Sequence, residues 1–303
     1  MNTRLSSWHN SPNCNVATIS ELLKQARSTL EDSPDAIQDS MRNATRDAEV
    51  LLCHVLNCNR THLYAWPDKT LGTKQAAQFK ELVNQRAQGT PVAYLTGVRE
   101  FWSLAFNVTP DTLIPRPETE LLVETVLQQF ENTPLEVLDL GTGAGTIAIA
   151  LAHERPNWHI TATDISSAAL SIARANADRH QLANLHLLHS HWFENLGNQR
   201  FDVIVSNPPY IAAADAHLEQ GDVRFEPVTA LTSGALGLDD IAHLCTHAAQ
   251  HLKPGGWFYC EHGFDQKSAV YECFAQHGFN HIIQLDDLAG QPRLTGGCVE
   301  PPT

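Results

Sequence analysis

Short apolar segments alternate with longer amphipathic segments through the second half of the chain, and this alternation constrains the fold more than any other feature. The apolar segments have the length of buried strands, and the segments between them have helical periodicity. Strands joined in sequence by helices pair in parallel, so the pattern predicts an α/β fold with a doubly wound, mostly parallel sheet. The expected strands are 135–140, 159–163, 185–189, 201–206, 257–261 and, last, 280–285; the expected helices are 146–153, 166–179, 238–252 and 266–277.

The chain before residue 90 has a different pattern, that of three amphipathic helices. The first begins with the capping box Thr18-x-x-Glu21, and Gly89-Thr90-Pro91 ends the series. Aromatic and β-branched residues around Gly97 then predict a short hairpin between residues 92 and 110. We therefore expect four parts: a disordered tail at 1–15, a small helical domain at 16–90, a hairpin linker at 91–115, and an α/β domain at 116–303.

Composition narrows the class of protein. Hydrophobic residues make up 43% and charged residues 18% of the 303 residues, which is typical of a globular chain, and no apolar run reaches the length of a membrane span. The seven cysteines form no Cys-x-x-Cys pair, which favours free thiols in a reducing cytoplasm. Residues 116–303 carry nine basic and twenty-three acidic residues, whereas the eleven basic and eleven acidic residues of 1–115 give that half no net charge. This imbalance argues against direct binding of the second half to nucleic acid.

A glycine-rich turn follows the first expected strand of the α/β domain. The sequence Gly141-Thr142-Gly143-Ala144-Gly145 lets the backbone approach a ligand closely, and Asp164 ends the next strand nineteen residues later, where a carboxylate can accept ribose hydroxyls. Thr146 stands where a dinucleotide-binding motif has its third glycine, which disfavours a pyrophosphate. S-adenosylmethionine fits better, because it has no pyrophosphate and its sulfonium suits an acidic domain, where Asp139 and Asp164 add negative charge.

A second loop, Asn207-Pro208-Pro209-Tyr210, follows the apolar run 201–206. The two prolines stiffen it. The side-chain oxygen of Asn207 and the carbonyl of Pro208 can each accept one N–H of a planar amine or amide, and Tyr210 can stack on the same group. These two acceptors would aim the nitrogen lone pair at a methyl carbon, which makes Asn207, Pro208 and Tyr210 the candidate catalytic residues. Because both loops end parallel strands, we expect them to face one cleft.

Asn-Pro-Pro-Tyr together with Asp-Leu-Gly-Thr-Gly-x-Gly resembles the class I methyltransferases that modify amino or amide nitrogens. Three further stretches are more particular, and with them nearly the whole chain resembles the bacterial peptide chain release factor glutamine methyltransferases. They are Leu-Thr-Gly-Val-Arg-Glu-Phe-Trp at 95–102, Leu-Ile-Pro-Arg-Pro-Glu-Thr-Glu at 113–120 and Gln-Gly-Asp-Val-Arg-Phe-Glu-Pro at 220–227.

The resemblance implies methylation of the glutamine side-chain amide in the Gly-Gly-Gln loop of class-one release factors, with the N-terminal helical domain helping to hold the release factor. It also implies site residues. The methyl donor would contact Gly141, Thr142, Gly143, Ala144, Gly145, Asp164, Trp192 and Asn207, and the glutamine would contact Asn207, Pro208, Pro209 and Tyr210.

The chain departs from the family at His191, where an acid often precedes the Trp-Phe pair. For two other segments the sequence leaves two interpretations open. Residues 116–119 could wall the cofactor cleft or simply begin a helix, and Arg224 and Glu226 could cover the pocket or pair with each other. The alternating histidines 186, 189 and 191 and the pair 243 and 247 lack the acid or cysteine that would complete a metal site, so no metal is expected.

Other functions remain open from the sequence. A related enzyme could methylate a glutamine of a ribosomal protein, and a nucleic-acid amino methyltransferase would use the same loop. Between residues 207 and 236, however, one basic residue, Arg224, faces four acidic ones, which favours a protein substrate. An oxidoreductase is disfavoured by Thr146, and a non-catalytic adenosine-binding protein would not need Asn207. We expect a monomer with no membrane partner.

Overall fold

The computed structural model describes residues 17–33 and 43–300, so the tail expected at 1–15 lies outside the described part of the chain. Contacts divide the protein into two compact units, Met1–Thr96 and Gly97–Thr303. Each unit contains a hydrophobic core of its own. The hairpin expected to act as a linker clusters with the second unit.

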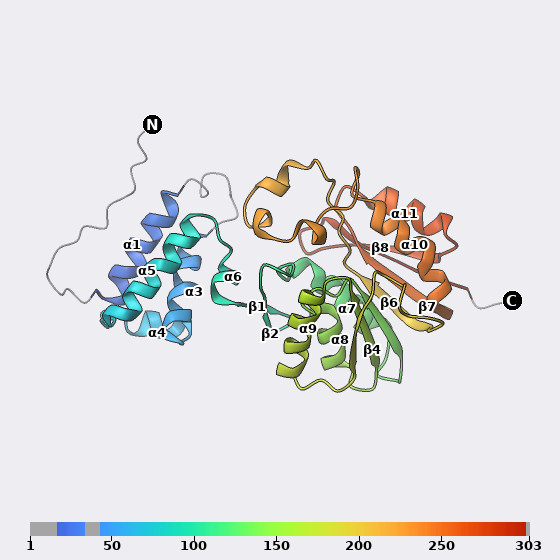
Figure 1. Ribbon diagram of the computed structural model, residues 1–303, viewed down its shortest axis with the longest axis horizontal. Coiled ribbons are helices and arrows are strands. Elements are labelled where there is room, and N and C mark those ends of the chain that lie inside the picture. Colours follow the sequence, from blue (N-terminus) through green and yellow to red (C-terminus); the bar gives the residue numbers. More distant parts are fainter. Residues whose placement is uncertain (1–16, 34–42, 301–303) are drawn as a thin grey trace. The chain divides into compact units, whose positions relative to one another are not determined.

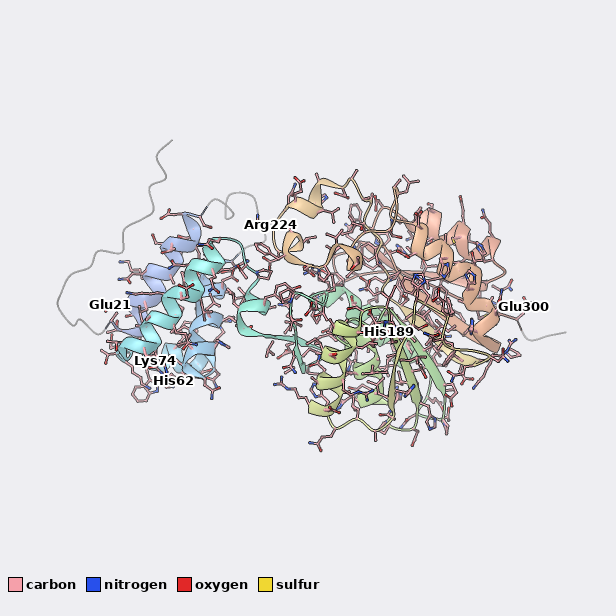
Figure 2. The ribbon with its side chains drawn as sticks, viewed as in Figure 1. Glu21, His62, Lys74, His189, Arg224 and Glu300 are labelled. Carbon is pink, nitrogen blue, oxygen red and sulfur yellow. The ribbon has the colours of Figure 1, made fainter. Side chains whose placement is uncertain are left out.

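The N-terminal unit is a helical bundle (Figure 1). Its described helices are α1 (Ile19–Glu31), α3 (Ala44–Leu56), α4 (Arg60–Ala65), α5 (Thr73–Ala87) and α6 (Val92–Thr96). The predicted capping box starts α1, since Thr18 accepts from the amide of Glu21 and the Glu21 side chain (Figure 2) accepts from the amide of Thr18. The apolar positions spaced three and four apart are buried together, among them Ile19, Leu22, Leu30, Leu51, Leu52, Phe79 and Val83.

The hairpin is shorter than the sequence predicts. Strands β1 (Val98–Phe101) and β2 (Leu104–Asn107) pair antiparallel, but residues 92–96 form helix α6 instead of extended chain. Pro91 accounts for this difference, because proline suits the first turn of a helix and its carbonyl accepts from the amides of Tyr94 and Leu95. The prediction of a hairpin over 92–110 was therefore wrong for its first residues.

The C-terminal unit is built on a seven-stranded sheet with the strand order β5-β4-β3-β6-β7-β9-β8. The strands are β3 (Glu136–Leu140), β4 (His159–Asp164), β5 (Leu185–His189), β6 (Phe201–Ser206), β7 (Leu252–Glu261), β8 (Asn280–Asp286) and β9 (Pro292–Cys298). The first five of these pair in parallel. The predicted doubly wound, mostly parallel α/β fold is confirmed. None of the described helices is long and apolar enough to cross a bilayer.

Strand β9 is the strand of this sheet that the sequence did not predict. It follows the segment expected to be last, inserts between β7 and β8, and pairs antiparallel with both. Its sequence, Pro-Arg-Leu-Thr-Gly-Gly-Cys, has two glycines and little alternation, so local propensity gives no strand signal. Its pairing partners on both sides decide its conformation.

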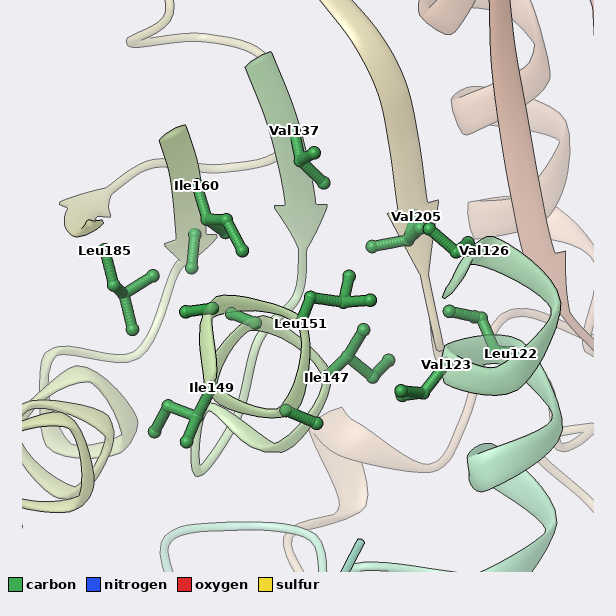
Figure 3. Close-up of a cluster of buried hydrophobic side chains, with 14 of the residues drawn as sticks. Leu122, Val123, Val126, Val137, Ile147, Ile149, Leu151, Ile160, Leu185 and Val205 are labelled. Atoms are coloured by element: carbon green, nitrogen blue, oxygen red, sulfur yellow. The ribbon is translucent and has the colours of Figure 1, made fainter. Parts of the chain in front are cut away.

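Helices cover both faces of the sheet (Figure 1). The helices are α7 (Glu120–Gln129), α8 (Thr146–Glu154), α9 (Ser167–Arg179), α10 (Asp239–His251) and α11 (Lys267–Gln276), with the single-turn helices η1 (Pro117–Thr119), η2 (Ala216–Glu219), η3 (Val223–Phe225) and η4 (Val228–Ala230). Figure 3 shows Ile147 and Leu151 of α8 between Val137 of β3 and Val123 of α7. Helix α8 is apolar nearly all round because strands and neighbouring helices enclose it, and this fixes the glycine-rich turn that precedes it.

Candidate active site

The glycine-rich turn joins β3 to α8. Gly141 has φ +72°, a left-handed conformation that favours glycine, and a Cβ there would lie 3.2 Å from the Trp192 ring. The amide of Gly145 donates to the carbonyl of Thr142 at 2.8 Å, which closes the turn before α8 begins. The absence of a side chain at Gly141 therefore leaves room between the turn and the indole.

Asp164 ends β4 beside this turn. Its Oδ2 accepts from the amide of Gly143 and its Oδ1 from the amide of Ser166, both at 2.8 Å. Burial raises the pKa of this carboxyl, and the two backbone hydrogen bonds partly offset that effect. Each oxygen keeps a lone pair for a further donor, so Asp164 can brace the turn and accept ligand hydroxyls at once.

A pocket of about 500 Å³ opens over these groups. Its walls come from the chain before η1, the glycine-rich turn, the ends of β4, β5 and β6, and the segment around η4. The lining residues are Pro110, Asp111, Thr112, Leu113, Gly141, Gly143, Asp164, Ile165, Ser166, Ala169, Ser190, His191, Trp192, Asn207, Pro209, Pro227, Thr229, Ala230 and Asp240. A volume of this size is ordinary for a small-molecule site.

The structure brings six of the predicted site residues to this pocket: Gly141, Gly143, Asp164, Trp192, Asn207 and Pro209. The two predicted loops thus face one cavity. They meet because β3 and β6 are neighbours, and the Ser206 hydroxyl donates to the carbonyl of Leu140 at 2.8 Å.

Five predicted site residues do not line the cavity: Thr142, Ala144, Gly145, Pro208 and Tyr210. Thr142 is buried and donates to Asp139 at 2.6 Å. Pro208 is buried and Tyr210 is half-buried, with its hydroxyl 3.3 Å from Glu261 Oε1. These residues support the lining from behind.

Asp139 also lies behind the turn. It is fully buried, and its Oδ2 accepts from the Thr142 hydroxyl and from the amide of Ala148. Burial raises the pKa of this carboxyl to about 7. Asp139 therefore braces the turn from below, and its side chain is absent from the pocket wall formed by the described residues.

Asn207 is held by a residue that lies far away in the sequence. Its Nδ2 donates to the hydroxyl of Thr119 at 3.1 Å, and Thr119 is 4% exposed. Residues 116–119 are not among the pocket-lining residues, so the structure favours the interpretation that they begin a helix. Thr119 also supports Asn207, which neither interpretation included. Only the tertiary structure identifies this contact.

Two pocket walls, 110–113 and 227–230, were not among the predicted site residues, although Leu113 and Pro227 belong to two of the stretches that resemble the family. A buried carboxylate ties them together, since Glu226 accepts from the amide of Ile114 at 3.0 Å and pairs with Arg116. The Arg224 guanidinium lies 4.9 Å from the Phe225 ring. The structure pairs Glu226 with Arg116, a partner that the sequence did not predict.

His191, noted in the sequence as a departure from the resemblance, lines the pocket. Its Nδ1 lies 3.0 Å from Glu194 Oε1, and its ring stacks 6.2 Å from that of His243. His189 (Figure 2) is 2.8 Å from the carbonyl of Ile165. Within the described part of the chain no three His, Cys, Asp or Glu side chains are placed to hold a metal ion.

Known proteins match this chain over most of its length. Two family models fit it, "PrmC N-terminal domain" over residues 21–97 and "Methyltransferase small domain" over residues 117–224. The "Release factor glutamine methyltransferase" of Shewanella oneidensis is 47% identical over 262 residues, which cover 85% of this chain and 90% of the relative. The chain belongs to the release factor glutamine methyltransferase family.

The predicted family is thereby confirmed, and with it the prediction of an S-adenosylmethionine-dependent methyltransferase. Another member of the release factor glutamine methyltransferase family, from Escherichia coli K12, is 46% identical over 83% of this chain and 91% of its own. Among solved structures, a methyltransferase from Pyrococcus furiosus superposes with a TM-score of 0.52 over 72% of this chain and 99% of that one, at 20% identity. That likeness shows the shared fold.

Proposed function

We propose that this enzyme methylates the side-chain amide nitrogen of the glutamine in the Gly-Gly-Gln motif of class-one peptide chain release factors. The printed name of its relatives, release factor glutamine methyltransferase, supports the substrate class. The observation that carries the proposal is the pocket itself, where Asn207 and Pro209 share one cavity with Gly141 and Asp164.

The pocket residues suit S-adenosylmethionine. Asp164 has lone pairs left for ribose hydroxyls, and Gly141 leaves its side-chain space free beside Trp192. When bound, S-adenosylmethionine supplies a methyl group on a positively charged sulfur, an electrophile for a neutral nitrogen. S-adenosylmethionine has no pyrophosphate, so the site does not need the third glycine of a dinucleotide-binding motif, and Thr146 occupies that position at the start of α8.

The loop after β6 would hold the acceptor. Nδ2 of Asn207 donates a hydrogen to Thr119, which fixes the orientation of the amide, and Oδ1, its only acceptor atom, would accept an N–H of the glutamine amide. The carbonyl of Pro208, which lies between the pocket-lining residues Asn207 and Pro209, would accept the second N–H. Together they would weaken conjugation of the amide nitrogen and favour its pyramidal geometry, and they would position the nitrogen for in-line attack. The proton can leave to water after the new N–C bond forms.

We further propose that the helical unit, 16–90, helps to hold the release factor, with 91–115 as the connection to the catalytic domain at 116–303. A cytoplasmic, monomeric enzyme remains the prediction from the sequence.

A ribosomal-protein glutamine is the second candidate substrate. A nucleic-acid base is less favoured, because four of the five charged Asp, Glu, Lys and Arg side chains between the loop after β6 and η4 are acidic.

The test replaces Asn207 with alanine. Asn207→Ala should lower kcat about 10²-fold, the usual scale for losing one positioning hydrogen bond at a reacting centre, while binding of S-adenosylmethionine changes less. Methyl transfer is measured with labelled S-adenosylmethionine and a release factor, and with a second release factor whose Gly-Gly-Gln glutamine is alanine. Near wild-type turnover by the Asn207 variant, or label on the alanine-substituted factor, would refute the proposal.

A further inference from the structure

The side-chain amide of Gln266 binds four backbone groups from three separate parts of the chain. Gln266 directly precedes helix α11 and is 8% exposed. Its Nε2 donates to the carbonyl of Tyr210 at 2.9 Å, and to the carbonyls of Gly237 at 3.2 Å and Leu236 at 3.3 Å. Its Oε1 accepts from the amide of Gly263 at 2.8 Å. Gln266 is not among the pocket-lining residues, so it acts on the pocket through these backbone groups.

The polarity of these partners fixes the orientation of the amide. A backbone N–H can only donate, and a backbone carbonyl can only accept. Oε1 must therefore face Gly263, and the two hydrogens of Nε2 must serve the carbonyls. Three carbonyls share these two hydrogens, and the bond to Tyr210 is the shortest of the three. The site thus requires a side chain that donates toward Tyr210.

The Gln266 amide is closely enclosed by glycines. A Cβ at Gly237 would lie 2.9 Å from Gln266 Nε2, and a Cβ at Gly263 would lie 3.1 Å from Gln266 Oε1. Both glycines therefore approach the amide more closely than a residue with a side chain could. The amide and the backbone groups around it form one tightly packed contact.

The three carbonyl partners flank one long segment, residues 211–235, which we call the wall segment. It leaves the loop after β6 and returns beside its own start. The amide of Ile211 donates to the carbonyl of Leu231 at 2.9 Å, and the amide of Ser233 donates to the carbonyl of Ile211 at 3.0 Å. The wall segment carries the pocket-lining residues Pro227, Thr229 and Ala230. Gln266 joins the residue directly before this segment to the two residues directly after it.

Tyr210 is coupled stiffly to Asn207. Only Pro208 and Pro209 lie between them, and the proline ring fixes φ, so a shift of the Tyr210 backbone is passed on to Asn207 instead of being absorbed. Asn207 and Pro209 line the same pocket as the wall segment. The position of Asn207 relative to the pocket wall at 227–230 therefore depends on the contact that holds both ends of that segment.

We propose that Gln266 is a positioning residue that clamps both ends of the wall segment and thereby sets the position of Asn207 relative to the pocket wall. This inference rests on the role proposed above for the loop after β6, because that role requires Asn207 to meet the acceptor nitrogen accurately. Its effect should appear in turnover and not in binding of S-adenosylmethionine, since Asp164 and Gly143 are held by a contact of their own.

The experiment compares Gln266→Met and Gln266→Glu in the full-length enzyme, with a release factor as substrate. Methionine keeps the length of the side chain without its amide, and Q266E keeps an acceptor for Gly263 but places a carboxylate against three carbonyls. We expect both variants to lower kcat about tenfold or more, with the Kd for S-adenosylmethionine within about twofold of the wild type. The kcat values are taken per S-adenosylmethionine-binding site, so unfolded protein does not contribute to the difference.

The pH dependence of Q266E separates a missing donor from a general loss of packing. Burial raises the pKa of the introduced carboxyl, and in its protonated form that carboxyl can again donate to the carbonyl of Tyr210. The ratio of kcat for Q266E to kcat for the wild type should therefore rise as the pH falls. The ratio is compared because both enzymes share the titratable groups that neighbour Gln266 and Gly237 in the chain, which are Asp239, Asp240, Glu261, His262, Asp265 and Lys267.

Gln284→Glu is the matched control. Nε2 of Gln284 donates to the carbonyl of Lys267 at 2.7 Å and to the hydroxyl of Thr295 at 3.1 Å. Q284E therefore makes the same chemical change beside the same helix, but it breaks contacts to α11 and β9 instead of the contact to the loop after β6. Its kcat should equal that of the wild type at every pH.

Wild-type kcat in Q266M, a Q266E ratio that does not change with pH, or equal losses in Q266E and Q284E would overturn the inference. Either Gln266 variant decides alone if the other fails to fold, and loss of the fold in both would show a purely structural role and overturn it as well. If N207A is inactive while Q266M is fully active, only this inference fails; if N207A is active, the proposed function fails.

Discussion

At the scale of single residues, Asp139 shows how burial changes a carboxyl that the sequence places next to the cofactor turn. The side chain is fully buried, and burial raises its pKa from 3.8 to about 7 although Thr142 and Ala148 donate hydrogen bonds to it. The folded chain thus holds this proton more tightly than the unfolded chain. The stability that this group contributes is fully present below pH 3.8 and is lost as the pH rises through about 7.

Asp139→Asn removes this titration while keeping one acceptor oxygen for Thr142 and Ala148. The free energy of unfolding of the wild type should therefore fall relative to that of D139N between about pH 4 and pH 8, by at most roughly 4 kcal/mol for a shift of this size. Urea unfolding across that range measures the difference. Asp178→Asn, on the exposed side of α9, is the control, and its free energy of unfolding should depend on pH as that of the wild type does. If the curves of D139N and the wild type run parallel, Asp139 does not have a raised pKa in the folded protein.

At the scale of elements, the loop after β6 is held in place by two residues from later in the chain, Gly237 before α10 and Gln266 before α11. Gln266 Nε2 donates to the carbonyl of Tyr210 at 2.9 Å and to that of Gly237 at 3.2 Å. Gly237 has φ +72°, and a Cβ there would lie 2.1 Å from the Tyr210 carbonyl oxygen. Because the backbone of Gly237 packs against the backbone of Tyr210, a side-chain movement could not make room for an added Cβ, and the loop itself would have to shift.

Gly237→Ala should consequently displace Tyr210 and lower turnover by about tenfold or more, because a small misplacement of a positioning group is costly for the reaction. Gly255→Ala is the matched control. Gly255 also has a positive φ, +80°, but a Cβ there would meet nothing within 4 Å. Both variants share the backbone strain, so both should lose some thermal stability, whereas only G237A should lose kcat. Equal kcat values for the two variants would argue against a role of this contact in holding the loop.

At the scale of the whole molecule, every pocket-lining residue lies between 110 and 240, within the unit Gly97–Thr303. That unit has its own hydrophobic clusters, and the helical unit has another. If S-adenosylmethionine binds in this pocket as proposed, its binding needs only the unit Gly97–Thr303, and it can be measured separately from recognition of the release factor.

A fragment of residues 97–303 should fold cooperatively and bind S-adenosylmethionine within about threefold of the intact enzyme, because its binding site is complete. Its KM for a release factor should rise, since the helical unit proposed to hold that partner is missing. Calorimetry and steady-state methylation measure the two effects. An unchanged KM would remove the proposed role of the helical unit, and a folded fragment without cofactor affinity would contradict the location of the site.

Much of the site could be predicted because its constraints are local. Glycine and proline restrict or free the backbone at their own positions, so the turn at Gly141 and the stiff loop at Pro208 are visible in the sequence, as is the strand that leads into each. The pocket walls at 110–113 and 227–230 are irregular and have no periodicity. They are fixed by Glu226, whose contact with Ile114 spans 112 positions of the chain.

The sequence by itself determined the helical unit, the parallel strands with their crossover helices, and the two loops at the strand ends, because hydrophobic periodicity and the conformational limits of glycine and proline act over a few neighbouring residues. Only the tertiary structure decided the place of β9 between β7 and β8, the pairing of Glu226 with Arg116, and the support of Asn207 by Thr119. Those features depend on groups far apart in the chain, where pairing and burial outweigh local preference.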